Sequence, residues 1–329
     1  MKRLLNRVLH EAMACLLPES KHEDNHFQHI YYHAIQDKAL HPLLANSPVS
    51  VKQFEKHLDY LIDHYDIVPL NSFVLTLKES NMMTRQKKML SISFDDGWKD
   101  NYTTLFPIIK SRKIPITIFL NTYNVSHQKP FWHVELLFLL EEIRKNNTHI
   151  IMDEEQVLSL DSLEQAYKQA FEIILPLAFS KRECFLIQLR KMVKKVNIPK
   201  HWLTWEECQE MENSGLVRFA AHTHTHTSIA ALDESECEKE LLDNITELKK
   251  HLKHPLSFFA YPNGLFNKKK SHVLKECKIK AAFTTEAHST KITNDLLFLP
   301  RHGICNWCRV AHLKNKLSGN QQIIDTFKN

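Results

Sequence analysis

The stretch KMLSISFDDG (residues 88–97) runs from an apolar segment directly into two adjacent carboxylates and a glycine. The apolar segment predicts a buried strand, and Asp-Gly is common turn chemistry at a strand end. A turn on the surface is therefore one explanation of Asp95 and Asp96. A functional site is the other, because like charges at the end of a buried strand repel each other unless a cation lies nearby.

Strand and helix patterns alternate on both sides of this stretch. Ser50 with Gln53, and Thr204 with Glu207, have the spacing of capping boxes and predict a helix start after each pair. Strands are expected at residues 29–33, 66–70, 88–94, 114–120, 216–221, 256–260, 280–285 and 296–300. Strands separated by helices favour a parallel sheet, and this many units favour a closed or nearly closed (β/α) barrel.

The alternation is interrupted between about 133 and 203, where long helical segments follow one another and no strand is predicted. We interpret this part as a helical insertion. With no internal repeat and no linker rich in Gly or Ser, residues 29–329 are expected to form a single barrel domain.

Residues 1–28 have helical spacing of leucines but are interrupted by polar residues, which favours an amphipathic helix over a secretory signal. This helix packs on the body or lies on a membrane surface. Seven cysteines without framework spacing favour a reducing compartment. We therefore predict a cytoplasmic protein, with peripheral membrane contact through this helix as the alternative.

The charge balance argues against nucleic acid as a partner, because 43 Lys and Arg against 38 Asp and Glu leave only +5 on 329 residues. The 21 histidines are an excess, which matters where their spacing could hold a metal. His222, His224 and His226 follow a predicted strand, and the first and last can face one ion in strand or helix geometry. An exposed polar run is the simpler alternative.

Two other predicted strands are also followed by residues that could belong to a functional site. Residues 261–264 (YPNG) form a turn whose backbone amides could face a substrate oxygen, and Arg301 and His302 follow another strand. Catalytic groups of barrels lie at the carboxyl ends of strands. One Asp and two His are a suitable open site for zinc or a related divalent ion.

These residues resemble the polysaccharide deacetylases of the NodB-homology type. Their Thr-Phe-Asp-Asp-Gly motif is similar to residues 93–97, and their His-Ser/Thr-x-x-His motif to residues 222–226; the resemblance extends over about 29–318. It implies a distorted, incomplete (β/α) barrel. By that resemblance Asp95 is the general base, and Asp96, His222 and His226 are the metal ligands.

The chain departs from this family pattern in its later motifs. Ala260 stands where the third motif has an arginine, and LPRHG replaces the final Leu-x-x-His. We therefore expect Arg301 to orient the base, His302 to act as the acid, and Tyr261 and Asn263 to contact substrate. The predicted function is metal-dependent, most simply zinc-dependent, removal of an N-acetyl group from an amino sugar of a glycan or glycan precursor. Hydrolysis of another small amide or ester, or carbohydrate binding with weak catalysis, are the alternatives.

Overall fold

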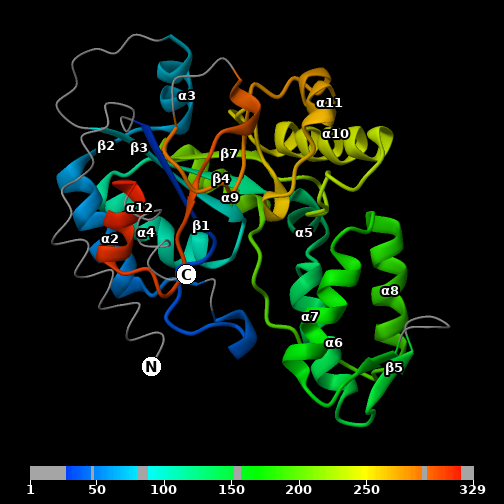
Figure 1. Ribbon diagram of the computed structural model, residues 1–329. Coiled ribbons are helices and arrows are strands. Elements are labelled where there is room, and N and C mark those ends of the chain that lie inside the picture. Colours follow the sequence, from blue (N-terminus) through cyan, green and yellow to red (C-terminus); the bar gives the residue numbers. More distant parts are fainter. Residues whose placement is uncertain (1–26, 46–47, 80–87, 152–156, 291–294, 320–329) are drawn as a thin grey trace.

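A curled parallel sheet forms the centre of the computed structural model, which describes residues 27–45, 48–79, 88–151, 157–290 and 295–319 (Figure 1). Neighbouring strands follow the order β10-β1-β3-β4-β7-β8-β9, and β2 pairs with the start of β3. The strands are β1 (Phe27–Tyr32), β2 (Tyr65–Ile67), β3 (Lys88–Asp96), β4 (Ile116–Leu120), β7 (Val217–Ala221), β8 (Phe258–Ala260), β9 (Ala281–Phe283) and β10 (His302–Gly303). The predicted α/β fold, an incomplete barrel, is confirmed.

The ends of the sheet approach each other. Leu299 forms an isolated parallel bridge with Phe283 of β9, and β10, a few residues later, pairs with β1. Side chains of strands that are not neighbours meet inside the curl: the rings of Phe119 and Phe283 have centroids 5.5 Å apart. Residues at alternate positions of each strand therefore face a shared interior.

Helices cover the outside of the sheet and close one end of it. They are α2 (Val51–His64), α3 (Leu70–Glu79), α4 (Phe106–Arg112), α5 (Thr122–His127), α9 (Trp205–Asn213), α10 (Glu234–His251), α11 (Ser271–Glu276) and α12 (Val310–Leu317). Phe73 of α3 belongs to the same apolar cluster as Phe27, the first residue of β1, and Met89, near the start of β3. This end is therefore filled with apolar side chains, and the carboxyl ends of the strands remain available for polar groups.

Helix starts follow the capping residues of the sequence. Thr204 and Glu207 form the predicted capping box at α9, with the two backbone–side-chain contacts at 3.0 and 3.4 Å. Ser50 caps α2, but Gln53 contacts His57 in place of closing the box. After β3, a π-helical turn, η3 (Asn101–Leu105), leads directly into α4.

Two sequence-based expectations on secondary structure were wrong. Residues 296–298 form a 3-10 helix, η6 (Leu296–Phe298), and the strand begins only after it, because Asp295 caps the helical turn by accepting a hydrogen bond from the Leu297 amide. The insertion also contains a two-stranded hairpin, β5 (His149–Ile151) with β6 (Val157–Ser159). Most of the expected N-terminal helix (1–28) lies outside the described residues, and Phe27 and Gln28 belong to β1.

The insertion forms a separate helical lobe, which we define as residues 132–191, with the gap at 152–156 not described (Figure 1). It consists of α6 (Trp132–Ile143), the hairpin, α7 (Leu163–Ile174) and α8 (Phe179–Lys191). Its helices share an apolar core of their own, and α7 contributes Ala166, Ala170 and Ile174 to it. Among the described residues, no helix has the length and apolar character needed to span a membrane.

Candidate active site

The two carboxylates lie at the carboxyl end of β3 and are separated by a change in backbone conformation. Strand alternation alone would put neighbours on opposite faces of the sheet. Asp96, however, has a φ of 76° and Gly97 one of 84°, so the chain leaves the extended conformation here. A side chain at Gly97 would also meet Leu120, since a Cβ there would lie 2.1 Å from a methyl carbon. Both carboxylates consequently line one cavity.

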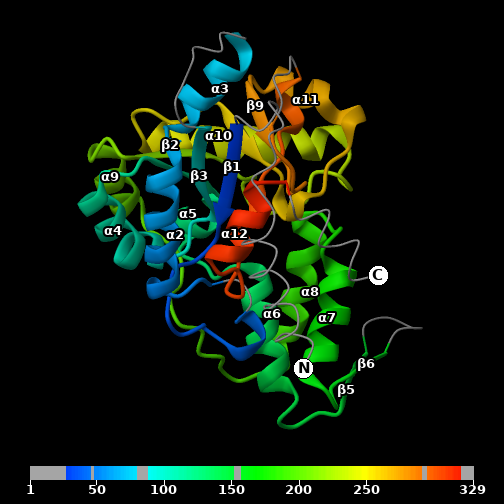
Figure 2. The same cartoon turned by 60° about the vertical axis from the view of Figure 1, so that its left-hand side comes forward.

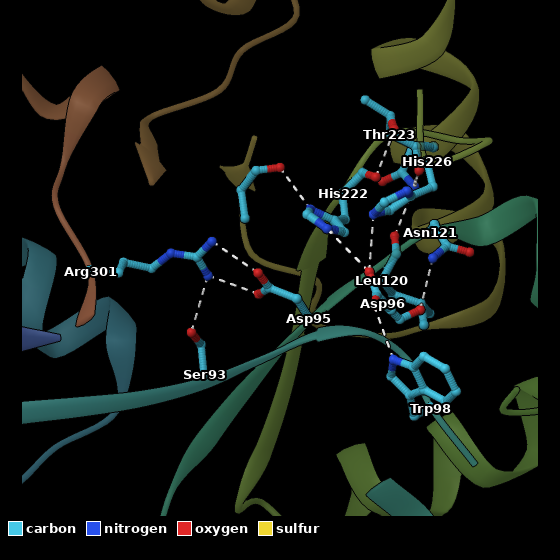
Figure 3. A network of polar contacts seen from close by, with 12 residues as sticks. Ser93, Asp95, Asp96, Trp98, Leu120, Asn121, His222, Thr223, His226 and Arg301 are labelled. Carbon is cyan, nitrogen blue, oxygen red and sulfur yellow. Dashed lines mark hydrogen bonds and ion pairs between the residues drawn. The ribbon is translucent and has the colours of Figure 1, made fainter. Parts of the chain in front are cut away.

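Asp95 is held by the arginine that sequence reasoning assigned to it. The Arg301 guanidinium donates to both carboxylate oxygens of Asp95, at 2.8 and 2.9 Å (Figure 3). Its Nε donates to the Thr284 carbonyl at 3.0 Å, and its Cζ lies 4.2 Å from the centroid of the Tyr31 ring. Arg301 is fully buried, and the two-pronged contact fixes the orientation of the carboxylate.

Asp96 faces two histidines from the loop that follows β7. Its Oδ1 lies 3.4 Å from His222 Nε2 and 3.1 Å from His226 Nε2. One ligand atom from each of the three residues falls within 4.8 Å of the others. His222 Nδ1 lies 2.8 Å from the Ala260 carbonyl, which can accept a hydrogen bond from its N–H and so leave the Nε2 lone pair available to a metal. The predicted residues therefore come together in the arrangement expected for a divalent cation.

The electrostatics of this cluster suit a cation. Asp96 Oδ2 accepts a hydrogen bond from the Trp98 indole at 3.0 Å, whereas buried Oδ1 is approached only by the two imidazoles among the described residues. Burial opposes ionisation of Asp96, but the neighbouring His226 and His222 outweigh it and hold its pKa well below the usual value. Burial lowers the pKa of His226 and favours the neutral imidazole that a metal needs.

Buried charges fix the loop that carries the histidines. Thr223 and His226 both have positive φ, 59° and 57°, which is uncommon for such residues. Between them, the Thr225 amide and hydroxyl donate to the Glu240 carboxylate of α10 at 2.9 and 2.5 Å. The Thr225 carbonyl accepts from Arg182 of α8 at 2.7 Å. The loop is therefore held by hydrogen bonds from both the helical lobe and a helix of the barrel.

His224 points away from the cluster that contains His222 and His226. Its Nδ1 lies 2.8 Å from the Thr122 hydroxyl. The conformation of the loop therefore directs the His222 and His226 side chains toward Asp96 and the His224 side chain toward α5.

These groups open into a cavity of about 750 Å³. Tyr261 and Asn263, the predicted substrate contacts, both line it, and Asn263 has a positive φ of 57° in a short 3-10 turn. The Tyr261 hydroxyl already donates a hydrogen bond to the Leu297 carbonyl at 3.0 Å. Tyr261 can therefore offer its ring and backbone to a ligand more readily than its hydroxyl.

His302 does not belong to this site, which corrects the sequence-based role of catalytic acid. It follows Arg301 on an extended segment, so the two side chains point to opposite faces. His302 Nε2 lies 3.1 Å from the Gln28 side-chain oxygen, on the side covered by α12, and His302 is not among the residues that line the cavity. Burial lowers its pKa to about 3.

Sequence reasoning missed several residues that line the cavity. Tyr31 and His33 end β1 and extend beyond it, and His133 comes from α6 of the lobe, with its ring centroid 6.1 Å from that of His226. Burial lowers the pKa of His133 to about 3 and raises that of Tyr31 to about 12. Strand alternation in residues 29–33 could have revealed Tyr31, but no local signal places the lobe over the strand ends.

The fold and the site define a half-barrel protein with a carboxylate–arginine pair beside an Asp-His-His cluster at its strand ends. The model of the polysaccharide deacetylase family matches residues 83–282, and the chain belongs to this family.

Relatives of this chain include the poly-beta-1,6-N-acetyl-D-glucosamine N-deacetylase of Staphylococcus aureus, 24% identical over 270 residues that cover 78% of this chain and 68% of that protein. Among solved structures, the Streptococcus pyogenes deacetylase PplD in complex with acetate has a TM-score of 0.59 at 18% identity, covering 88% of this chain and 97% of its own. IcaB from Ammonifex degensii has a TM-score of 0.57 at 18% identity, covering 88% and 96%. These structures share the fold.

Proposed function

We propose that the protein is a metal-dependent N-deacetylase that releases acetate from N-acetylglucosamine units of a glycan. The observation that carries the proposal is the placement of the Asp95–Arg301 pair beside the Asp96, His222 and His226 cluster in one cavity. One group can act as a base while the other holds a cation. Membership of the polysaccharide deacetylase family supports the reaction class.

Asp96, His222 and His226 would hold the cation, and zinc suits one carboxylate with two imidazoles. When bound, a divalent cation supplies Lewis acidity that makes water easier to deprotonate and an acyl oxygen more electrophilic. The unused Oδ1 of Asp96 and the two Nε2 atoms are the donor atoms that this structure offers.

Asp95 accepts a proton from the attacking water, and Arg301 keeps both oxygens of that carboxylate in a fixed orientation. The backbone of residues 261–263 borders the cavity and offers amides for the negative charge that develops on the acyl oxygen. Since His302 is turned away, the proton gained by Asp95 is available for the departing nitrogen. One carboxylate then serves as base and acid, and the products are acetate and a free amine.

The substrate class follows from the relatives. The Staphylococcus aureus protein is named for a polymer of N-acetylglucosamine. A cavity of about 750 Å³ lies toward the large end of the range for ligand sites and exceeds the needs of one acetyl group.

An acetate-release assay tests the proposal. Purified protein is stripped with a chelator and supplied with zinc or another divalent ion, and acetate is measured with β-1,6- and β-1,4-linked N-acetylglucosamine oligosaccharides. We expect release only after metal addition, and none from the Asp95→Asn variant. Release from simple amides or esters but from no oligosaccharide would contradict the glycan substrate, and undiminished release after chelation would contradict the metal.

A further inference from the structure

Helix α7 of the helical lobe forms one wall of the cavity that contains Asp95 and Asp96. Five of its residues and its C-cap, Leu175, line this cavity at spacings of three and four: Glu164, Tyr167, Lys168, Phe171, Glu172 and Leu175. These spacings place them on one face of the helix. Figure 2 shows α7 beside α6 and α8 in the lobe, which lies below the sheet in this view. A segment outside the barrel therefore shares a cavity with the site.

Only part of the cavity face of α7 helps to stabilise the lobe: Tyr167, Phe171 and Leu175 pack against the lobe core, whereas the charged residues of this face do not. Ala166, Ala170 and Ile174 pack into the lobe core, whereas Glu164, Lys168 and Glu172 are exposed. Within the described part of the chain, neither Glu164 nor Glu172 has an ion-pair partner. The polar groups of this face are therefore free to bind a ligand.

Two half-buried rings lie among these polar groups. The Phe171 ring stacks on Trp132 with centroids 5.0 Å apart and planes at 22°, and Tyr167 lies 5.9 Å from Phe171. Burial raises the pKa of Tyr167, so its hydroxyl stays protonated as a donor. No hydrogen bond joins that hydroxyl to another described residue. A firmly supported ring with an unused hydroxyl thus borders the cavity.

We propose that this face of α7 is a sugar-binding subsite, which holds pyranose units of a glycan chain next to the unit whose acetyl group is removed. This inference rests on the proposed function. Pyranose rings carry apolar C–H faces that pack on aromatic rings, and the Tyr167 and Phe171 side chains offer such rings. Carboxylates accept hydrogen bonds from sugar hydroxyls, and Glu164 and Glu172 flank the rings along the helix. The protein accordingly prefers a chain of sugars to a single sugar.

Kinetics with substrates of different length test the subsite. Tyr167→Ala is compared with wild type on a hexasaccharide of N-acetylglucosamine and on a small acetyl ester that fills only the catalytic end of the cavity. Loss of one aromatic contact should raise KM for the hexasaccharide about three- to tenfold, with kcat unchanged and ester hydrolysis unaffected. Tyr167→Phe should keep most of the affinity because it keeps the ring.

Gln169→Ala is the matched control, since Gln169 lies on the outward side of the same helix and is exposed. It should leave both substrates unchanged. Equal losses on the hexasaccharide and the ester, or no loss on either, would overturn the subsite.

If wild-type protein releases no acetate from any glycan, the proposed function fails, and calorimetric titration of the hexasaccharide into wild type and Tyr167→Ala decides the subsite. Weaker binding by the variant supports the subsite, whereas equal binding, or no binding by either protein, overturns it. The unfolding midpoint of each variant excludes a folding defect.

Discussion

Replacing Arg301 with lysine keeps a positive charge beside Asp95 but removes the geometry of the contact. The guanidinium makes two parallel hydrogen bonds to the carboxylate, at 2.8 and 2.9 Å, and a third to the Thr284 carbonyl at 3.0 Å. A lysine ammonium is a point donor and cannot reproduce all three. At about 1.5–3 kcal/mol for a hydrogen bond to a charged group, we expect Arg301→Lys to lower the free energy of unfolding by about 2–4 kcal/mol.

Arg301→Met should cost more, because it leaves the buried Asp95 carboxylate without a counter-charge. Breaking a buried ion pair in this way costs about 3–5 kcal/mol. In the lysine variant we expect kcat to fall by about 10²-fold, because the base is no longer fixed in orientation. Metal content should stay unchanged, since Arg301 makes no contact with Asp96, His222 or His226 in the structure.

Urea unfolding, steady-state acetate release and metal analysis measure these three effects. Arg112→Lys is the matched control, because Arg112 also pairs with a carboxylate, Asp59, but on the surface. Such exposed pairs contribute about 0–1 kcal/mol. Wild-type kcat in Arg301→Lys would refute the orienting role, and loss of metal together with activity would show that Arg301 instead supports the metal cluster.

Three further predictions follow from the same structure. Asp95→Asn should abolish turnover and keep metal affinity, whereas Asp96→Asn should lose both; calorimetric metal titration checks this, and equal metal loss would contradict the division. Arg182→Met removes the donor to the Thr225 carbonyl and should weaken metal binding about 10-fold, with unchanged affinity as the contrary result. Burial lowers the pKa of His57 to about 4, so His57 is neutral in the fold and only the unfolded state takes up its proton as the pH falls below about 6.5. The contribution of His57 should therefore lower the free energy of unfolding by about 3 kcal/mol between pH 6.5 and 4. Urea titrations at a series of pH values measure this, and the same slope in His57→Gln as in wild type would refute it.

The parts of the site that sequence reasoning found are those set by local pattern. Strand alternation and strand ends place Asp95, Asp96 and His222 at one edge of the sheet, and the same logic led to Arg301. The wrong role for His302 also came from an argument based on a strand end. The segment at 296–300 was expected to be a strand, but a 3-10 turn occupies 296–298, and on the extended residues that follow, only one of two neighbours can face the interior.

The parts that sequence reasoning missed depend on contacts between distant segments. The lobe was recognised as helical, yet nothing in its periodicity shows that His133 and Tyr167 border the same cavity as Asp95. Nor does a local pattern show that Arg182 reaches the Thr225 carbonyl, 43 residues away in sequence. Tertiary packing alone brings these groups to the strand ends.

The two adjacent carboxylates of the FDDG stretch can share one cavity because they are neutralised by different partners. Asp95 remains on the strand and faces inward, where a fully buried guanidinium from the closing edge of the sheet compensates its charge. Asp96 leaves the strand with a positive φ, and Gly97 continues the turn with another positive φ. A glycine is needed there because Leu120 occupies the space that a side chain would take. Its carboxylate then faces two imidazoles, and with them a cation could offset its charge. The backbone turn separates two like charges, so that Asp95 pairs with Arg301 while Asp96 Oδ1 faces the two histidines, where it could serve as a ligand in the proposed site. An Asp-Asp pair on a surface turn would need neither partner, and so the buried arginine and the histidine loop together favour the functional explanation of this stretch over the simple turn.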